Sequence, residues 1–343
     1  MQKTNNKFKL NKNELNSSGI FTISLDFERM WGLYDLKMEG YDENIEGINK
    51  AIDAILNIFC EFGIHSTWAT VGLLFFKDIN ELNKNLPEKK PNYDNLLNAY
   101  QYINERSNLD QNKHFSPDTI IKISKVAGQE IGSHTFSHYY CLENGQSVDE
   151  FDCDIQSAVK VAKKFNLDLK SLVFPRNQFD TIYLKVLKKY KIASYRGNEK
   201  HWVYHSGYRP DDQLLKRAIR FLDSYLNISG NNCYSLNEVS NSSPYNIRSS
   251  YFLRPFSNKL KYLERLKEKR ILDSMTYAAK NNKIFHLWWH PHNFGTNLEN
   301  NISFLYKILS HFHHLEKQYG MTSLNMGEIS NTISEYQNGR VSN

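Results

Sequence analysis

Three pairs of histidines stand four residues apart in this chain of 343 residues: His134/His138, His201/His205 and His286/His290. On a helix or a tight turn, two residues at this spacing share a face at roughly 6 Å and can hold one metal ion. On a strand, about 13 Å separates them, and they cannot share an ion. The local structure around each pair therefore decides whether it can bind metal.

His134 and His138 form the predicted metal-binding pair. They directly follow Gly132-Ser133, where a short predicted strand ends and the chain can curl into a turn. The alternative is a pair of surface or capping histidines. His286 and His290 belong to a predicted strand, and His201 and His205 to an extended segment, so neither of these two pairs is expected to chelate.

Two carboxylates stand at the end of the first predicted strand. A metal held by two histidines needs a carboxylate and an open position for water or substrate. Asp26 and Glu28 are two residues apart, so on a strand their side chains point to the same side. One of them can then bind the metal while the other acts as a base. The alternative is an exposed acidic strand end.

Two further strand ends carry candidate catalytic groups. Arg176 follows the predicted strand 171–174, and His290 and His292 follow the predicted strand 284–289. In an α/β barrel, residues just past the C-terminal ends of the strands form the active site. Arg176 could orient the base, and His290 or His292 could protonate a leaving group.

Short β-prone runs alternate with amphipathic helical patterns along most of the chain. This alternation predicts an α/β fold with a parallel sheet or barrel. The expected strands are 20–25, 64–71, 130–133, 171–174, 192–195, 284–289 and 322–325. The expected helices are 45–62, 117–128, 147–165, 181–190, 258–281 and 300–318, followed by a terminal helix.

The predicted organisation is one barrel domain over residues 19–335, preceded by a polar segment over residues 1–18. Two stretches interrupt the alternation. Residues 76–115 are rich in Asn and Lys, and residues 197–257 are rich in Asn, Ser, Tyr and Arg. We expect both to be insertions, because long excursions at strand ends often cover a site.

Composition excludes several classes of protein. With 40% apolar and 23% charged residues, the chain is neither disordered nor a small disulfide scaffold. Its four cysteines lack CxxC spacing. The net charge of +6 suits an anionic substrate or weak membrane contact rather than nucleic acid. No apolar run has the length of a signal peptide or a spanning helix, which predicts a cytoplasmic protein. Oligomeric state is not predicted.

The ordered motifs resemble those of the polysaccharide deacetylases of carbohydrate esterase family four, the NodB-like domain. Ser24-Leu-Asp-Phe-Glu28 resembles the strand-end TFDD-type element, and His134-Thr-Phe-Ser-His138 matches H[ST]xxH. Phe174-Pro-Arg176 and Leu287-Trp-Trp-His290 are similar to the later arginine and histidine elements, and Thr67-Trp-Ala-Thr-Val-Gly72 to the second-strand pattern. The resemblance covers roughly residues 19–200 and 283–328.

This resemblance implies a deformed (β/α)7 barrel, a bound divalent metal, usually zinc, and hydrolysis of an N-acetyl group on a sugar. The resemblance implies that Glu28, His134 and His138 are the metal ligands and that Asp26 is the base, positioned by Arg176. It implies that His290 is the general acid, with His292 as its rival or as a substrate contact. Trp202 would be the aromatic residue that packs under the acid. One departure is that Phe27 replaces the second Asp of the motif, so that Glu28 supplies the acid one place later.

Two alternatives remain at this stage. The replaced Asp allows a barrel that binds carbohydrate without turnover. His290-Pro291-His292 allows a metal-dependent amidohydrolase, although such enzymes carry this motif near the first strand rather than the last. For the deacetylase, we expect the substrate to be an N-acetylated sugar or an intracellular precursor of a bacterial surface glycan.

Overall fold

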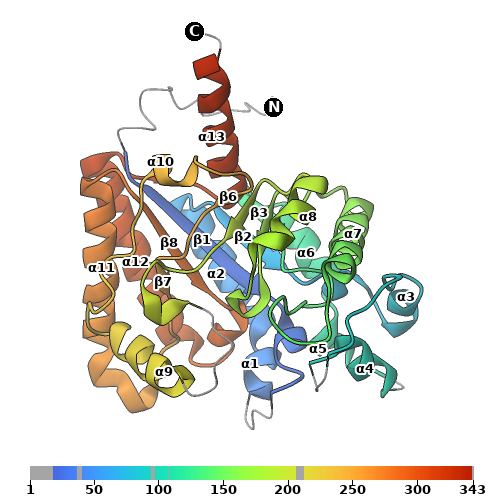
Figure 1. The fold of residues 1–343 in the computed structure, drawn as a ribbon. Helices are drawn as coiled ribbons and strands as arrows, with labels where there is room; N and C mark the ends of the chain where they lie inside the picture. The colour runs from blue at the N-terminus through green and yellow to red at the C-terminus, as the bar shows by residue number, and fades with distance from the viewer. Residues whose placement is uncertain (1–17, 37–40, 94–96, 107, 206–211, 342–343) are drawn as a thin grey trace, which may run out of the picture.

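A single curved sheet of parallel strands forms the centre of the computed structural model, which describes residues 18–36, 41–93, 97–106, 108–205 and 212–341 (Figure 1). Its strand order is β6-β5-β4-β3-β2-β1-β8-β7, and β9 pairs with β1. The strands are β1 (Ile20–Phe27), β2 (Ser66–Thr70), β3 (Gln129–Ser133), β4 (Ser171–Val173), β5 (Ser194–Arg196), β6 (Tyr245–Asn246), β7 (Tyr251–Phe252), β8 (Ile284–Trp289) and β9 (Thr322–Ser323). Apart from Ser18, the predicted polar segment 1–18 lies outside the described residues.

Helices pack around this sheet. The α-helices of the described residues are α1 (Asp42–Glu46), α2 (Ile48–Phe62), α3 (Ile79–Asn83), α4 (Ala99–Asn104), α5 (Gln111–His114), α6 (Pro117–Ser124), α7 (Val148–Lys164), α8 (Leu184–Lys189), α9 (Asp212–Asp223), α10 (Leu236–Val239), α11 (Glu264–Lys280), α12 (Leu298–Tyr319) and α13 (Met326–Val341). Short 3-10 helices are η1 (Arg29–Gly32), η2 (Gly72–Phe75), η3 (Pro175–Asn177), η4 (Thr181–Tyr183), η5 (Trp202–Tyr204), η6 (Asn258–Leu263) and η7 (Pro291–Phe294).

Strand β1 occupies the middle of the sheet and is buried along its whole length. It pairs in parallel with β2 on one side and β8 on the other. A strand covered on both faces needs a nearly continuous apolar sequence, which the run 20–25 supplies. The first polar groups near its carboxyl end are Ser24 and Asp26, and Glu28 follows the last residue of the strand. The sheet thus delivers both predicted carboxylates to one end of the barrel.

The two ends of the sheet are joined by residues 247–250, which link β6 to β7. The Ile247 N–H donates to the Tyr195 carbonyl on the β5 side at 2.9 Å, and the Ser250 N–H donates to the His286 carbonyl in β8, also at 2.9 Å. This bridge curls the sheet into the predicted deformed barrel. Residues 197–257, expected to be an insertion, therefore contribute strands β6 and β7 to the sheet itself.

The segment 76–115 is not a purely polar excursion. It forms α3, α4 and α5, and its Tyr93 and Tyr100 are buried. The Tyr140 N–H donates to the Tyr93 hydroxyl at 2.8 Å, and the Trp31 indole N–H donates to the His114 carbonyl at 2.6 Å. The segment therefore packs against the loops that follow β1 and β3.

Candidate metal centre

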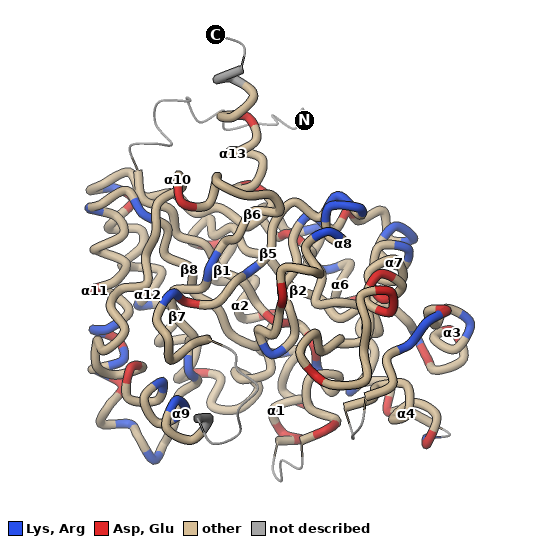
Figure 2. Tube along the Cα trace, in the orientation of Figure 1, with Lys and Arg blue, Asp and Glu red and all other residues tan. Residues whose placement is uncertain are grey.

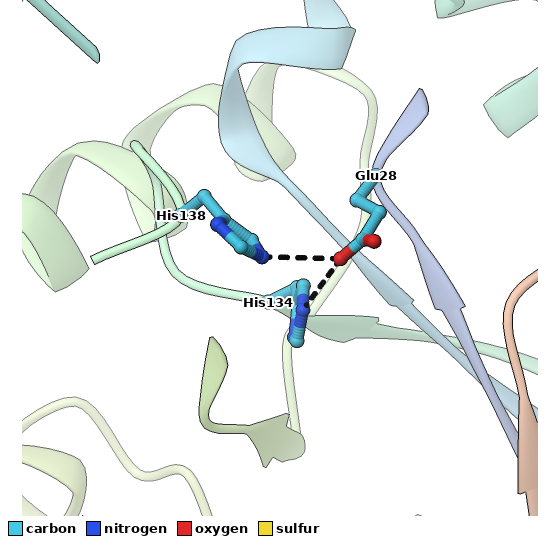
Figure 3. Close-up of side chains that lie close together, drawn as sticks. All are labelled: Glu28, His134 and His138. Atoms are coloured by element: carbon cyan, nitrogen blue, oxygen red, sulfur yellow. Dashed lines mark hydrogen bonds and ion pairs between the residues drawn. The ribbon is translucent and has the colours of Figure 1, made fainter. Parts of the chain in front are cut away.

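Glu28, His134 and His138 converge at the carboxyl end of the sheet (Figure 3). Glu28 Oε2 lies 3.2 Å from His134 Nε2 and 3.1 Å from His138 Nε2. All three side chains are buried, and their candidate ligand atoms lie within 4.8 Å of one another. Within the described residues, no other group of three or more His, Cys, Asp and Glu side chains meets this condition. The turn predicted for the His134/His138 pair is confirmed.

A tight loop brings the two histidines to one point. Thr135 and His138 both adopt positive φ angles, of 62° and 59°, which turn the chain sharply after β3. Asp154 of α7 accepts hydrogen bonds from the Phe136 and Ser137 backbone N–H groups and from the Ser137 hydroxyl. We call residues 134–138 the histidine loop. The hydrogen bonds to the Asp154 carboxylate hold the backbone of this loop in place.

The outer nitrogen of each imidazole has a partner of its own. His134 Nδ1 lies 2.9 Å from the Val173 carbonyl, and His138 Nδ1 lies 3.0 Å from the Tyr140 hydroxyl. For His134, donation to the carbonyl places the proton on Nδ1 and leaves the Nε2 lone pair facing Glu28. Such outer contacts orient histidine ligands in metal sites. Two imidazole nitrogens and one carboxylate therefore form a donor set that fits zinc or a similar divalent ion with an open position.

The protonation states at this cluster also suit a cation. Burial alone would raise the pKa of Glu28, but His290 and the two loop histidines outweigh it and hold the pKa well below its usual range. Burial lowers the pKa of His138. Metal ligands must be deprotonated, so an ionised Glu28 and a neutral His138 match the requirement.

Asp26 is held by Arg196 at the end of β5. The guanidinium donates to Oδ1 and to Oδ2 of Asp26, each at 2.7 Å, and also to the Ser24 hydroxyl at 2.9 Å. Burial would raise the pKa of Asp26, but the charge of Arg196 outweighs it and lowers the pKa. The carboxylate is therefore kept ionised in a fixed orientation.

The sequence-based assignment of this task to Arg176 is wrong. Arg176 pairs instead with Asp35 and lies over the Tyr140 ring at 4.4 Å. Its φ angle is 53° in the turn η3 that follows β4, and its guanidinium is held at Asp35 rather than at Asp26. Arg196 could have been found by the rule that selected Arg176, because it too ends a predicted strand.

His290 faces both carboxylates. Its Nε2 lies 3.4 Å from Glu28 Oε1 and 3.9 Å from Asp26 Oδ2, and its side chain is 24% exposed. The rings beside it are Trp288 and Phe252, with centroids 5.8 and 6.0 Å away. His290 thus combines contact with the cluster and access to solvent.

Trp202 was expected to pack under His290, and this expectation is wrong. Trp202 is 51% exposed, and its ring contacts His201. Trp288 takes the expected position, between His290 and the guanidinium of Arg196, which lies 4.1 Å from its ring. The strand alternation of β8 places Trp288 and His290 on the same side, a signal that the sequence did contain.

His292 lies beside His290, with the ring centroids 5.0 Å apart. The strand ends before Pro291, as predicted, but the following turn η7 brings His292 back rather than turning it elsewhere. The side chain is buried, and burial lowers its pKa to about 3. A neutral, buried imidazole cannot donate a proton from a cationic state at neutral pH, so His290 is the better placed acid.

The other paired histidines lie outside the cluster. His286 is buried within β8, and its Nε2 lies 2.8 Å from the Ser24 hydroxyl. His201 and His205 flank η5, and His205 Nε2 contacts the Lys200 carbonyl. His286 lies on a strand as predicted, whereas the segment from His201 to His205, which was expected to be extended, contains the 3-10 helix η5.

The fold has known counterparts. No protein-family model matches the sequence, and no curated protein resembles it. A crystal structure of a protein from Mycobacterium smegmatis, assigned as a polysaccharide deacetylase, aligns with a TM-score of 0.56 at 12% identity, covering 94% of this chain and 92% of that one. The 4-alpha-glucanotransferase from Thermococcus litoralis aligns with a TM-score of 0.50 at 13% identity, covering 94% of this chain but 40% of that one. The chain therefore has the fold of polysaccharide deacetylases.

This fold also occurs in a protein of different activity, so the fold does not decide the reaction. The side chains at the site, rather than the fold, determine the function. Among the described helices, none combines the length and the apolar character that crossing a membrane requires.

Proposed function

We propose that this chain is a metal-dependent carbohydrate N-deacetylase, which hydrolyses an N-acetyl group on a sugar. One observation carries the proposal: the Glu28/His134/His138 cluster lies beside an ionised carboxylate, Asp26, and a partly exposed imidazole, His290. A ligand set, a base and an acid are the groups that hydrolysis of an unactivated amide needs. The fold shared with polysaccharide deacetylases supports a sugar amide as the substrate.

Glu28, His134 and His138 would hold the metal ion. When bound there, a divalent ion such as zinc supplies a polarised carbonyl and a water of lowered pKa. Glu28 replaces the Asp that the motif usually carries, and its longer side chain reaches both imidazoles from the residue just past β1. The departure in sequence is therefore compatible with a complete ligand set.

Asp26 and His290 would divide the proton transfers. Asp26 accepts the proton of the attacking water at its carboxylate, and Arg196 keeps that carboxylate ionised beforehand. His290 donates a proton from Nε2 to the departing amine. Trp288 and Phe252 pack against the imidazole and limit the orientations that it can adopt.

The test is release of acetate from N-acetylated mono- and oligosaccharides, measured together with metal content. We expect acetate release by the zinc-loaded protein, its loss after chelation and its return with added zinc. A protein that binds stoichiometric zinc and sugar without releasing acetate would instead be the non-catalytic carbohydrate-binding barrel. The intracellular glycan precursor stays a prediction.

A further inference from the structure

A cavity of about 660 Å³ adjoins the candidate metal centre. Trp288 and Phe252 line this cavity, and the same two rings pack against His290. Asn177 also lines the cavity, and its side-chain oxygen accepts a hydrogen bond from Arg196, the partner of Asp26. The cavity therefore adjoins the rings beside His290 and extends to α9.

Four of the described residues that line this cavity are arginines. Arg217 and Arg220 project from α9, whose basic positions are marked in Figure 2, and Arg254 follows β7. Among the side chains that the structure describes, which exclude those of residues 206–213, no carboxylate oxygen lies within 4 Å of the guanidinium nitrogens of these three. The fourth lining arginine, Arg176, is paired with Asp35. Three guanidinium groups thus share one cavity with no carboxylate partner among the side chains that the structure describes.

The surroundings balance this charge only in part. Burial lowers the pKa of Arg220, and the charges of Arg217 and Arg254 act in the same direction, whereas Tyr204 and Glu199 raise it. Glu199 is the one carboxylate among the cavity-lining residues described, and burial raises its pKa. The Arg254 Nε–H donates to the Ser224 hydroxyl at 2.6 Å, which fixes this side chain against the wall.

We propose that this cavity binds a phosphate or diphosphate group attached to the sugar that is deacetylated. The inference rests on the proposed function, because it makes the substrate an N-acetylated glycosyl phosphate or diphosphate rather than a neutral glycan. Guanidinium groups bind phosphate oxygens through paired, charge-assisted hydrogen bonds, and several converging arginines are typical of phosphate sites. A single carboxylate of a ligand would pair with one of these guanidinium groups, whereas the oxygens of a diphosphate can pair with all three.

Two carriers share this chemistry, a nucleoside diphosphate and a polyprenyl diphosphate. Phe221 and Tyr204 on the cavity wall offer aromatic surface, and Leu214 at its rim is 76% exposed. A base can stack on an aromatic ring, and an isoprenoid chain can cover an exposed leucine. The phosphate chemistry is common to both, so the experiment separates the carriers.

Binding to the full-length protein is measured by isothermal titration calorimetry with three probes: uridine diphosphate, farnesyl diphosphate and methyl N-acetylglucosaminide. The variants are Arg217→Ala and Arg220→Ala, with Lys216→Ala as the matched control because it stands on α9 but does not line the cavity. Titration of His134→Ala separates anion binding at the arginines from binding to a metal ion.

We expect at least one diphosphate to bind, with its affinity reduced about tenfold or more in each arginine variant and unchanged in Lys216→Ala and His134→Ala. Binding of uridine diphosphate alone identifies a nucleotide carrier, and binding of farnesyl diphosphate alone identifies a lipid carrier. Failure of both to bind at millimolar concentration, or equal affinity in the arginine variants, overturns the inference. Because this readout does not need turnover, it stays separate from failure of the proposed deacetylation.

Discussion

At the scale of single residues, the site is defined by charge pairing inside a buried cluster. Two arginines end neighbouring strands, yet only Arg196 contacts Asp26, while Arg176 is paired with Asp35. Each arginine thus supplies the opposite charge that a buried carboxylate needs, and geometry decides which carboxylate it meets. The residue-scale predictions separate these roles.

Arg196→Met should lower kcat by about 100-fold or more and move the acidic limb of the pH–rate profile to higher pH. Arg196 lowers the pKa of Asp26, so without it the base stays protonated over a wider pH range. The measurement is kcat/KM against pH, with unfolding temperature followed in parallel. Arg176→Met is the control, and an equal shift of the acidic limb in both variants would show that neither arginine acts on Asp26 specifically.

His134→Ala and His138→Ala should each lose most of the bound zinc and most activity. Each variant removes one of three protein ligands, and ligand loss costs several kcal/mol of metal affinity. Zinc per chain is measured by elemental analysis after dialysis, with His201→Ala as a control outside the cluster. Stoichiometric zinc in both loop variants would rule out this ligand set.

His290→Ala should lower kcat by roughly 10²–10⁴ while zinc remains bound. The imidazole faces Glu28 and Asp26 but lies outside the three-ligand cluster. The loss should shrink for an activated ester, whose leaving group needs less protonation. His292→Ala is compared under the same conditions, and a larger fall in its kcat than in that of His290→Ala would exchange the two roles.

At the scale of elements, the histidine loop depends on α7. The loop carries two residues with positive φ angles, and the Asp154 carboxylate accepts from the backbone N–H groups of Phe136 and Ser137. The Gly72 N–H of η2 also donates to the Thr135 carbonyl at 2.9 Å. A strained loop persists only when its surroundings determine its shape, so the geometry of the candidate metal centre rests on contacts outside Glu28, His134 and His138.

Asp154→Ala should reduce the free energy of unfolding by about 3 kcal/mol and weaken zinc binding. It leaves two backbone N–H groups and one hydroxyl in a buried site without their acceptor. Urea unfolding and zinc titration are the measurements, and Gln156→Ala on the exposed face of α7 is the control. Unchanged zinc affinity in a destabilised Asp154→Ala protein would show that the loop keeps its shape without this carboxylate.

At the scale of the whole molecule, barrel closure and the active site are connected through one buried histidine. His286 Nδ1 lies 3.2 Å from the carbonyls of Ile247 and Arg248 in the segment that joins the sheet ends. Its Nε2 contacts the Ser24 hydroxyl, which in turn accepts from Arg196. Closure of the barrel therefore also holds the group that positions Asp26.

The stability of the protein should fall below about pH 6.5 in a way that depends on His286. Burial lowers its pKa to about 3, whereas the imidazole of the unfolded chain titrates near 6.5. Between these values the unfolded state binds the extra proton, so stability is present above pH 6.5 and is lost as the pH falls. His286→Gln removes this titrating group. The free energy of unfolding of the variant, measured with urea, should therefore fall by about 1.4 kcal/mol less per pH unit than that of the unmodified protein. Parallel stability profiles for the two proteins would contradict the prediction.

The sequence by itself determined the features that depend on local spacing. The strand 284–289 was predicted at its observed bounds, and the alternation of strands and helices gave the class of fold. The histidine loop followed from a pair of residues at the end of a strand, and Asp26 and Glu28 from their separation of two. Each of these depends on residues that are neighbours in the chain, where periodicity carries the information.

Only the tertiary structure decided which distant side chains meet. Arg196 comes from 170 residues beyond Asp26, and every arginine at a strand end has the same local pattern. The curvature of the sheet and the turn at Arg176 select between them. Barrel closure by residues 247–250 and the arginine-lined cavity likewise depend on contacts between segments far apart in the chain. Local periodicity contains no information on such contacts, because they depend on how the strands twist and where the loops fold back.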